Sequence, residues 1–217
     1  CLPQAHFRFR RKQCRTIVHP QTPTRMKQAE FEIVSSCQIS STKVLVNQQL
    51  LWQHQQEEED WFSVIYRNLG LTYPKFFKMD RLCKAGILGS ELLLKDYPFD
   101  KENVKTSWGI ILCNSASSLD NDRKYQETIA HPDNYYPSPS LFVYTLANIV
   151  TGEIAIRHKI GGESSFYVMP QYNADFIQEL INQSYIANPE FNHLIGGWIN
   201  VDEQEIDVQL MLTKRKI

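Results

Sequence analysis

The sequence lacks paired cysteines, long apolar runs and an excess of one charge. Its five cysteines are an odd number without a Cys-x-x-Cys pair or a histidine at metal-ligand spacing, which favours free thiols over disulfides or zinc. The most apolar stretch, residues 141–156, is interrupted by Thr145, Asn148 and Glu153 and is too polar for a membrane span. We expect a cytoplasmic protein without metal or cofactor and without membrane contact.

Acidic residues are absent from residues 1–25, which carry six basic side chains, although the whole chain has a formal net charge of −1. Such a segment can steer a protein toward nucleic acid. It has no apolar periodicity, however, and the first methionine is Met26. We therefore expect residues 1–25 to be a disordered or non-native leader, residues 30–217 to form one domain, and nucleic acid not to be a partner.

Hydrophobic periodicity predicts an α/β domain with a five-stranded mixed sheet covered by helices. The stretch 48–60 is rich in glutamine and ends in acids, and it is interpreted as a solvated helix start. Strands are predicted at 31–40, 106–115, 163–169, 193–201 and 206–214, and helices at 61–69, 78–96, 122–129, 141–160 and 174–187. The alternation of the two indicates a largely parallel sheet that ends in a hairpin.

Residues 141–160 give the longest helix signal and are apolar nearly all round, which predicts an interior helix. Gly152 inside it suggests that another backbone passes close by. Gly161 and Gly162 are expected to end the helix. His158 then lies at the negative end of the helix dipole, where a charged imidazole is favourable.

Four landmarks, in this order and spacing, resemble a known family. They are Met79–Asp80–Arg81 at a helix start, Trp108–Ile111 in a strand, Gly152–Arg157 followed by Gly161–Gly162, and Gly196–Val201 in a later strand. Over residues 32–214 the chain is similar to the N-terminal half of β-ketoacyl-acyl-carrier-protein synthases of the thiolase-like superfamily. This resemblance implies a thiolase-like half-fold.

The resemblance also implies where a nucleophile would lie. In such synthases the strand matching 163–169 ends at a sharp turn that carries the acyl-accepting cysteine, where a helix N-terminus stabilises the thiolate. Here that position falls on Gln171, within one residue, and no neighbour in the turn is Cys, Ser or Thr. The loss of the nucleophile resembles that in chain-length factors, which pair with an active synthase. Covalent acyl transfer at this turn is therefore not expected.

By the same resemblance the chain is expected to be a non-catalytic accessory subunit in bacterial fatty-acid, polyketide or aryl-polyene biosynthesis. Its expected partners are a complete ketosynthase and an acyl carrier protein, in a homo- or heterodimer. The dimer contact is expected along the strand through Glu163, Ser165, Tyr167 and Met169. Surface that a second synthase half normally covers is expected to be exposed and apolar.

Two alternatives stay open. The chain could be an active acyltransferase or condensing enzyme, completed by a partner or using Cys113, which ends a predicted buried strand. His158 and His193 are weaker candidates for such chemistry. The third alternative is a stand-alone acyl-binding module.

Overall fold

The computed structural model describes residues 29–54, 60–133, 135–202 and 205–216. The leader expected at residues 1–25 and the acids at 57–59 lie outside the described residues. In the part that is described, every helix is too short or too polar to cross a bilayer.

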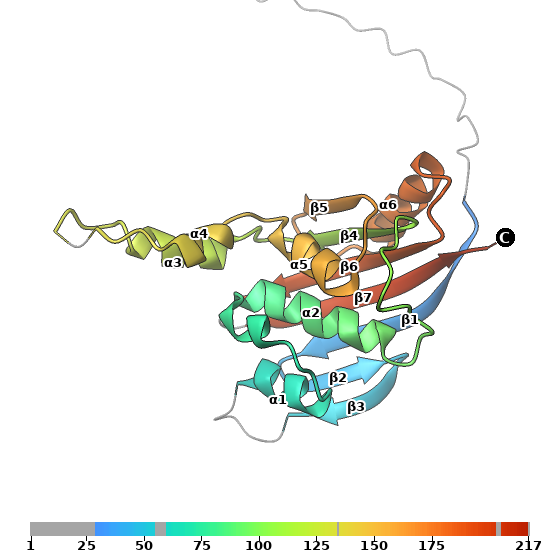
Figure 1. Cartoon of the computed structure of the whole chain (residues 1–217), viewed down its shortest axis with the longest axis horizontal. Coiled ribbons are helices and arrows are strands. Elements are labelled where there is room, and N and C mark those ends of the chain that lie inside the picture. The colour runs from blue at the N-terminus through green and yellow to red at the C-terminus, as the bar shows by residue number, and fades with distance from the viewer. Residues whose placement is uncertain (1–28, 55–59, 134, 203–204, 217) are drawn as a thin grey trace, which may run out of the picture.

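Seven strands form one mixed sheet in the order β3-β2-β1-β7-β6-β4-β5 (Figure 1). In chain order they are β1 (Phe31–Ser40), β2 (Lys43–Val46), β3 (Gln49–Gln53), β4 (Trp108–Asn114), β5 (Ser164–Val168), β6 (His193–Val201) and β7 (Ile206–Arg215). Strand β4 is parallel to β5 and β6, and the other neighbouring pairs are antiparallel. The α/β class is confirmed, but the expected five strands and the largely parallel sheet are wrong.

The two strands that the sequence did not indicate, β2 and β3, form a hairpin at the start of the glutamine-rich stretch. Asn47 and Gln48 join them with φ angles of 50° and 65°, the sign that a type I′ turn requires at both central residues. The Asn47 side chain accepts a hydrogen bond from the backbone N–H of Ser36 at 2.8 Å. Because Gln48 replaces the usual glycine, the turn carries no clear sequence signal.

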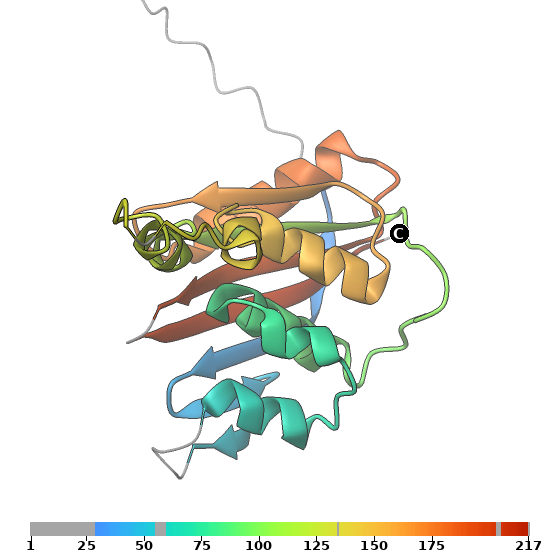
Figure 2. The same cartoon turned by 60° about the vertical axis from the view of Figure 1, so that its left-hand side comes forward.

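Helices cover both faces of the sheet (Figures 1 and 2). Helices α1 (Trp61–Asn68), α2 (Arg81–Leu94) and α5 (Ile149–His158) lie on one face, with the 3₁₀ turn η1 (Pro74–Lys78) before α2, and α6 (Ala174–Ala187) lies on the other. Asp80 caps α2 by accepting from the backbone N–H of Cys83, and Asn173 caps α6 in the same way through Phe176. The helices predicted at 61–69, 78–96 and 174–187 are confirmed.

The single interior helix predicted at 141–160 is wrong. The structure has α4 (Pro139–Val143), a turn, and then α5, and the Ile156 side chain on α5 is 66% exposed. The hydroxyl of Thr145, in the turn between α4 and α5, donates to the carbonyl of Phe142, three residues back. Such side-chain bonds compete with helical backbone bonds and favour a break.

The close approach expected at Gly152 occurs at Gly86 on the facing helix α2. A Cβ atom at Gly152 would meet nothing within 4 Å, whereas one at Gly86 would lie 2.5 Å from Cγ2 of Val150. Glycine at position 86 therefore lets α2 and α5 pack closely.

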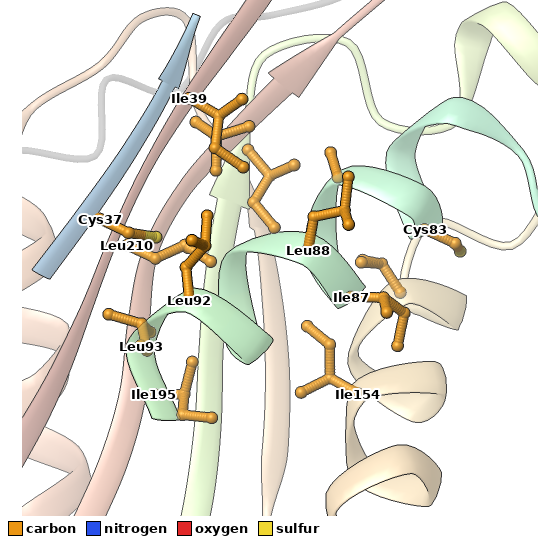
Figure 3. Packing of buried hydrophobic residues seen from close by; sticks show 14 of the residues in the cluster. Cys37, Ile39, Cys83, Ile87, Leu88, Leu92, Leu93, Ile154, Ile195 and Leu210 are labelled. Carbon is orange, nitrogen blue, oxygen red and sulfur yellow. The ribbon is translucent and has the colours of Figure 1, made fainter. Parts of the chain in front are cut away.

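The main hydrophobic core lies between the sheet and α2 (Figure 3). Ile87, Leu88, Leu92 and Leu93 of α2 point toward Cys37 and Ile39 of β1, Leu210 of β7 and Ile154 of α5, and each is at most 2% exposed. A second core cluster lies under α6 and includes Cys113, Met169 and Trp198.

Residues 115–133 and 135–148 form an arm that projects from the body beyond the ends of β4 and β5 (Figure 1). It contains α3 (Leu119–Glu127), predicted at 122–129, and α4. The two helices pack on each other through Tyr125 and Phe142 and through a bond from Asn121 Nδ2 to the carbonyl of Leu141. Its exposed large apolar residues are Leu119, Tyr135, Tyr136, Phe142, Val143 and Leu146.

Candidate functional site

The turn between β5 and α6 has the strand–turn–helix geometry that the sequence predicts. Met169 is buried, and its backbone N–H donates to the carbonyl of Asn114 at 2.8 Å. Gln171 follows in an exposed turn, and Asn173 then begins α6. The positive end of the α6 dipole thus lies beside a neutral amide, which cannot form an acyl intermediate. That Gln171 matches the nucleophile position of a synthase stays a prediction.

Among the described thiols, Cys113 shares a buried cluster with Met169, the first residue of this turn. It is fully buried on β4, in register with Tyr167 on β5 and in the same apolar cluster as Met169 and Trp198. Burial raises the pKa of Cys113 to about 11 and, with a small opposing effect of a backbone hydrogen bond, raises the pKa of Cys37 to about 12. Burial also raises the pKa of Cys83. At neutral pH all three described thiols are therefore protonated and weakly nucleophilic.

Polar side chains connect the carboxyl ends of β4 and β6 near the turn. The Asn114 amide makes two bonds to the backbone of Ser117, at 2.9 and 2.8 Å. Oδ1 of Asn200 accepts from the backbone N–H and the hydroxyl of Ser115. This network, which the sequence did not reveal, holds the root of the arm against the sheet. The sequence feature that could have indicated the network is an asparagine near the end of each of two buried strands, Asn114 and Asn200.

A buried acid lies at the base of the arm. Glu153 on α5 is 3% exposed and accepts hydrogen bonds from Lys75 Nζ at 2.6 Å and from the Tyr144 hydroxyl at 3.5 Å. The bond to Glu153 raises the pKa of Lys75, and burial raises the pKa of Tyr144. Cavities of about 230 and 70 Å³ flank this base, and Asp80 lines both. The group joins η1, α5 and the arm, and the raised pKa values keep its amine and its phenol protonated.

The two candidate histidines lie at the opposite end of the parallel strands from Gln171. His158 ends α5, and its Nε2 is 2.8 Å from the Ser90 hydroxyl. His193 begins β6, stacks on Trp108 with ring centroids 4.2 Å apart, and has Nε2 2.6 Å from the Tyr97 hydroxyl. The structure therefore does not bring either histidine to the turn.

Both imidazoles are neutral at physiological pH. Burial, with smaller contributions from Arg157, Lys101 and Lys105, lowers the pKa of His158 to about 3. Burial and Lys214 lower the pKa of His193 to about 4. The charged interaction of His158 with the end of helix α5, expected from the sequence, is therefore wrong, because burial costs the imidazolium more than the helix dipole returns.

No protein-family model matches the chain, and no curated protein matches it. Several solved structures match the chain. The ishigamide ketosynthase/chain length factor matches with a TM-score of 0.56 and 17% identity, over 70% of this chain and 47% of that chain. The ketosynthase ApeO in complex with its chain length factor ApeC, from Xenorhabdus doucetiae, matches with a TM-score of 0.52 and 11% identity, over 88% and 80%. The chain has a ketosynthase-like fold.

A third structure is that of AntDE:AntF, a type II polyketide synthase acyl carrier protein in complex with its ketosynthase. It has a TM-score of 0.60 and 9% identity, over 88% of this chain and 63% of that chain. The ketosynthase-like fold of this chain thus spans less than two thirds of the ishigamide and AntDE:AntF chains, and four fifths of the Xenorhabdus chain.

Proposed function

We propose that the chain is a non-catalytic, ketosynthase-like accessory subunit that pairs with a complete ketosynthase. The pathway is bacterial fatty-acid, polyketide or aryl-polyene biosynthesis in the cytoplasm. The observation that carries the proposal is the β5–α6 turn. A ketosynthase-like fold presents Gln171 there, while the described thiols are buried with raised pKa values.

The free edge of β5 supports pairing with another chain. β5 is the last strand of the sheet, and its ladder to β4 includes bonds through Glu163 and Met169. Backbone groups alternate in direction along a parallel strand. Those of Ser164, Phe166 and Val168 therefore face the free edge, and those of Ser165 and Tyr167 face β4. A second strand added there would satisfy the free groups, and the side chains of Ser165 and Tyr167 would flank the contact.

The arm supports the same arrangement. Its exposed apolar side chains surround two short helices that have little core of their own, and the bond from Met169 to Asn114 connects the root of the arm to the end of β5. A partner added at β5 would therefore lie beside the arm. The exposed apolar side chains of the arm are of the kind that a partner covers.

The titles of the matched structures fit these partners. One is a ketosynthase with its chain length factor, and another is a ketosynthase with its acyl carrier protein. We extend these partner kinds to this chain as part of the proposal.

Co-expression tests the pairing. Val168→Pro removes an N–H that faces the free edge and leaves the β4–β5 ladder intact, whereas Val168→Thr keeps it and serves as the matched control. With a complete ketosynthase encoded beside this chain, we expect wild type and Val168→Thr to co-purify with it and Val168→Pro to be lost. Equal recovery of all three variants would exclude pairing through β5.

One observation favours a second candidate function. Cys113 lies in the same buried cluster as Met169, so a partner-induced movement that exposes it would place a thiol beside the α6 N-terminus. The chain would then be an acyltransferase completed by its partner. Transfer of an acyl group to Cys113 in the complex distinguishes this function from the accessory role.

A further inference from the structure

A cavity at the opposite end of the parallel strands from the Gln171 turn has no part in the proposed function. It has a volume of about 490 Å³ and lies where α1, α2 and α5 end, at the amino end of the parallel strands. This volume is in the range of small-molecule sites. The side chains that matter for its chemistry are Glu91, Tyr97, Phe99, Lys101, Arg157 and His158.

Arg157 is held in one orientation at the cavity wall. Its Nε donates to Oε1 of Glu91 at 2.6 Å, and its guanidinium carbon lies 4.7 Å from the centre of the Tyr73 ring. Among the described residues its two terminal nitrogens have no hydrogen-bond partner. A guanidinium fixed at Nε and on one face presents its remaining N–H groups as a fork, which matches the oxygens of a phosphate or carboxylate.

His158 supplies an acceptor in the same wall. The Ser90 hydroxyl donates to the carbonyl of Ile87 at 2.9 Å, so the neutral imidazole donates from Nε2 to the Ser90 oxygen. Nδ1 then carries the lone pair. His158 lines the cavity, and Nδ1 is the ring atom that a ligand donor would use there.

The charge of the lining is positive. Lys95, Lys101 and Arg157 face one acid, Glu91, and His158 is neutral, which gives a net charge of +2. Helix ends bring negative carbonyls, but turn N–H groups occupy several of them. Tyr97 donates to Leu94, Leu71 to Tyr66 and Ile160 to Ala155. These bonds reduce the negative charge of the helix ends, and the side chains of the lining carry a net charge of +2.

An aromatic wall completes the site. Phe99 packs edge-on against Trp108, at 5.2 Å, and against His158, at 5.7 Å, and Tyr97 lines the cavity beside it. We propose that this cavity binds a small organic phosphate. The dianion matches the +2 lining and contacts Arg157 and Lys101. A ligand hydroxyl or amine donates to His158 Nδ1, and the organic part packs on Tyr97 and Phe99.

Titration of the isotope-labelled full chain, followed by NMR, tests the site. Phenyl phosphate is the probe, and phenol is its uncharged control. We expect phenyl phosphate to shift the amide resonances of residues 68–72, 94–101 and 157–160 in a saturable manner, and phenol at the same concentration to leave them in place. Phenylacetate, with one negative charge, should bind more weakly.

Three variants separate ligand contact from a structural role. Arg157→Gln and Lys101→Gln should each weaken phenyl phosphate binding about tenfold, the loss expected for one charge-assisted hydrogen bond. Glu91→Gln removes the only acid among these lining residues and should tighten binding. Lys43→Gln, an equal loss of charge on the distant strand β2, should change nothing.

Lys101 has an exposed side chain and can be replaced without disturbing the fold, so the test survives if Arg157→Gln does not fold. Absence of saturable shifts with phenyl phosphate would overturn the proposal. Unchanged binding in both Arg157→Gln and Lys101→Gln would do so as well, because it would mean that neither cation contacts the phosphate. Equal affinity for phenylacetate and phenyl phosphate would overturn the choice of ligand, because the site would then take a carboxylate as readily as a phosphate. None of these outcomes bears on pairing through β5.

Discussion

Burial sets the protonation state of the residues that the sequence offers as chemical groups. Cys113 lies near the end of a buried strand, a position that favours an active-site residue. Its apolar surroundings nevertheless raise its pKa to about 11 and keep the thiol protonated. Gln171 could be located from the sequence, because the strand, the turn and the Asn173 cap are all local signals. The Arg157–Glu91 pair could not, because its members are 66 residues apart and only the packing of α2 on α5 brings them together.

The buried histidines predict a loss of stability in acid. An unfolded histidine binds a proton below pH about 6.5, whereas the folded chain resists protonation down to a pKa of about 3 at His158 and about 4 at His193. The unfolded state therefore binds more protons, and the free energy of unfolding should fall as the pH decreases from 6.5 to 4. Urea unfolding at several pH values measures this slope.

The variant His158→Gln isolates one of these groups. It should flatten the slope by up to about 1.4 kcal/mol per pH unit between pH 6 and 4, the value for one proton. The exposed residue His131, changed to Gln, is the matched control for loss of a histidine. An unchanged slope in His158→Gln would contradict the assignment of His158 as neutral in the folded chain.

At the scale of elements, the sequence predicts what periodicity and caps determine. Helices α1, α2 and α6 and strands β1, β4, β6 and β7 follow from such local patterns. The β2–β3 hairpin was missed because its Asn47–Gln48 turn lacks glycine. The break between α4 and α5 was missed because the apolar run 141–160 fits the pattern of one helix. The competing hydrogen bond of the Thr145 side chain has no periodicity signal.

Two helical glycines form a matched pair for testing the packing of α2 on α5. Gly152→Ala should raise the free energy of unfolding by about 1 kcal/mol, because alanine favours helix and a Cβ there meets no atom within 4 Å. Gly86→Ala gains the same propensity but places its Cβ 2.5 Å from Val150, and should lower stability by about 1–3 kcal/mol. Chemical denaturation measures both changes in the free energy of unfolding. A stabilising Gly86→Ala would mean that α2 and α5 pack less closely than described.

At the scale of the whole molecule, the arm and the edge of β5 are the features that a partner would use. Tyr135 and Tyr136 on the arm are 59% and 75% exposed. Changing both to serine should alter the stability of the lone chain by no more than about 0.5 kcal/mol, as for other surface sites. In the proposed complex the same change should weaken association at least about tenfold, measured by calorimetry with the purified ketosynthase. Unchanged affinity would show that the arm does not contact the partner.

The measurement that tests the central claim most directly is the intact mass of the chain after incubation with malonyl- and acyl-loaded carrier protein, with and without the ketosynthase. Because Gln171 cannot accept an acyl group and the described thiols are protonated, the mass of this chain should stay unchanged while the ketosynthase gains the acyl group. An acyl adduct on this chain that disappears in Cys113→Ala would contradict the account and establish the chain as an enzyme.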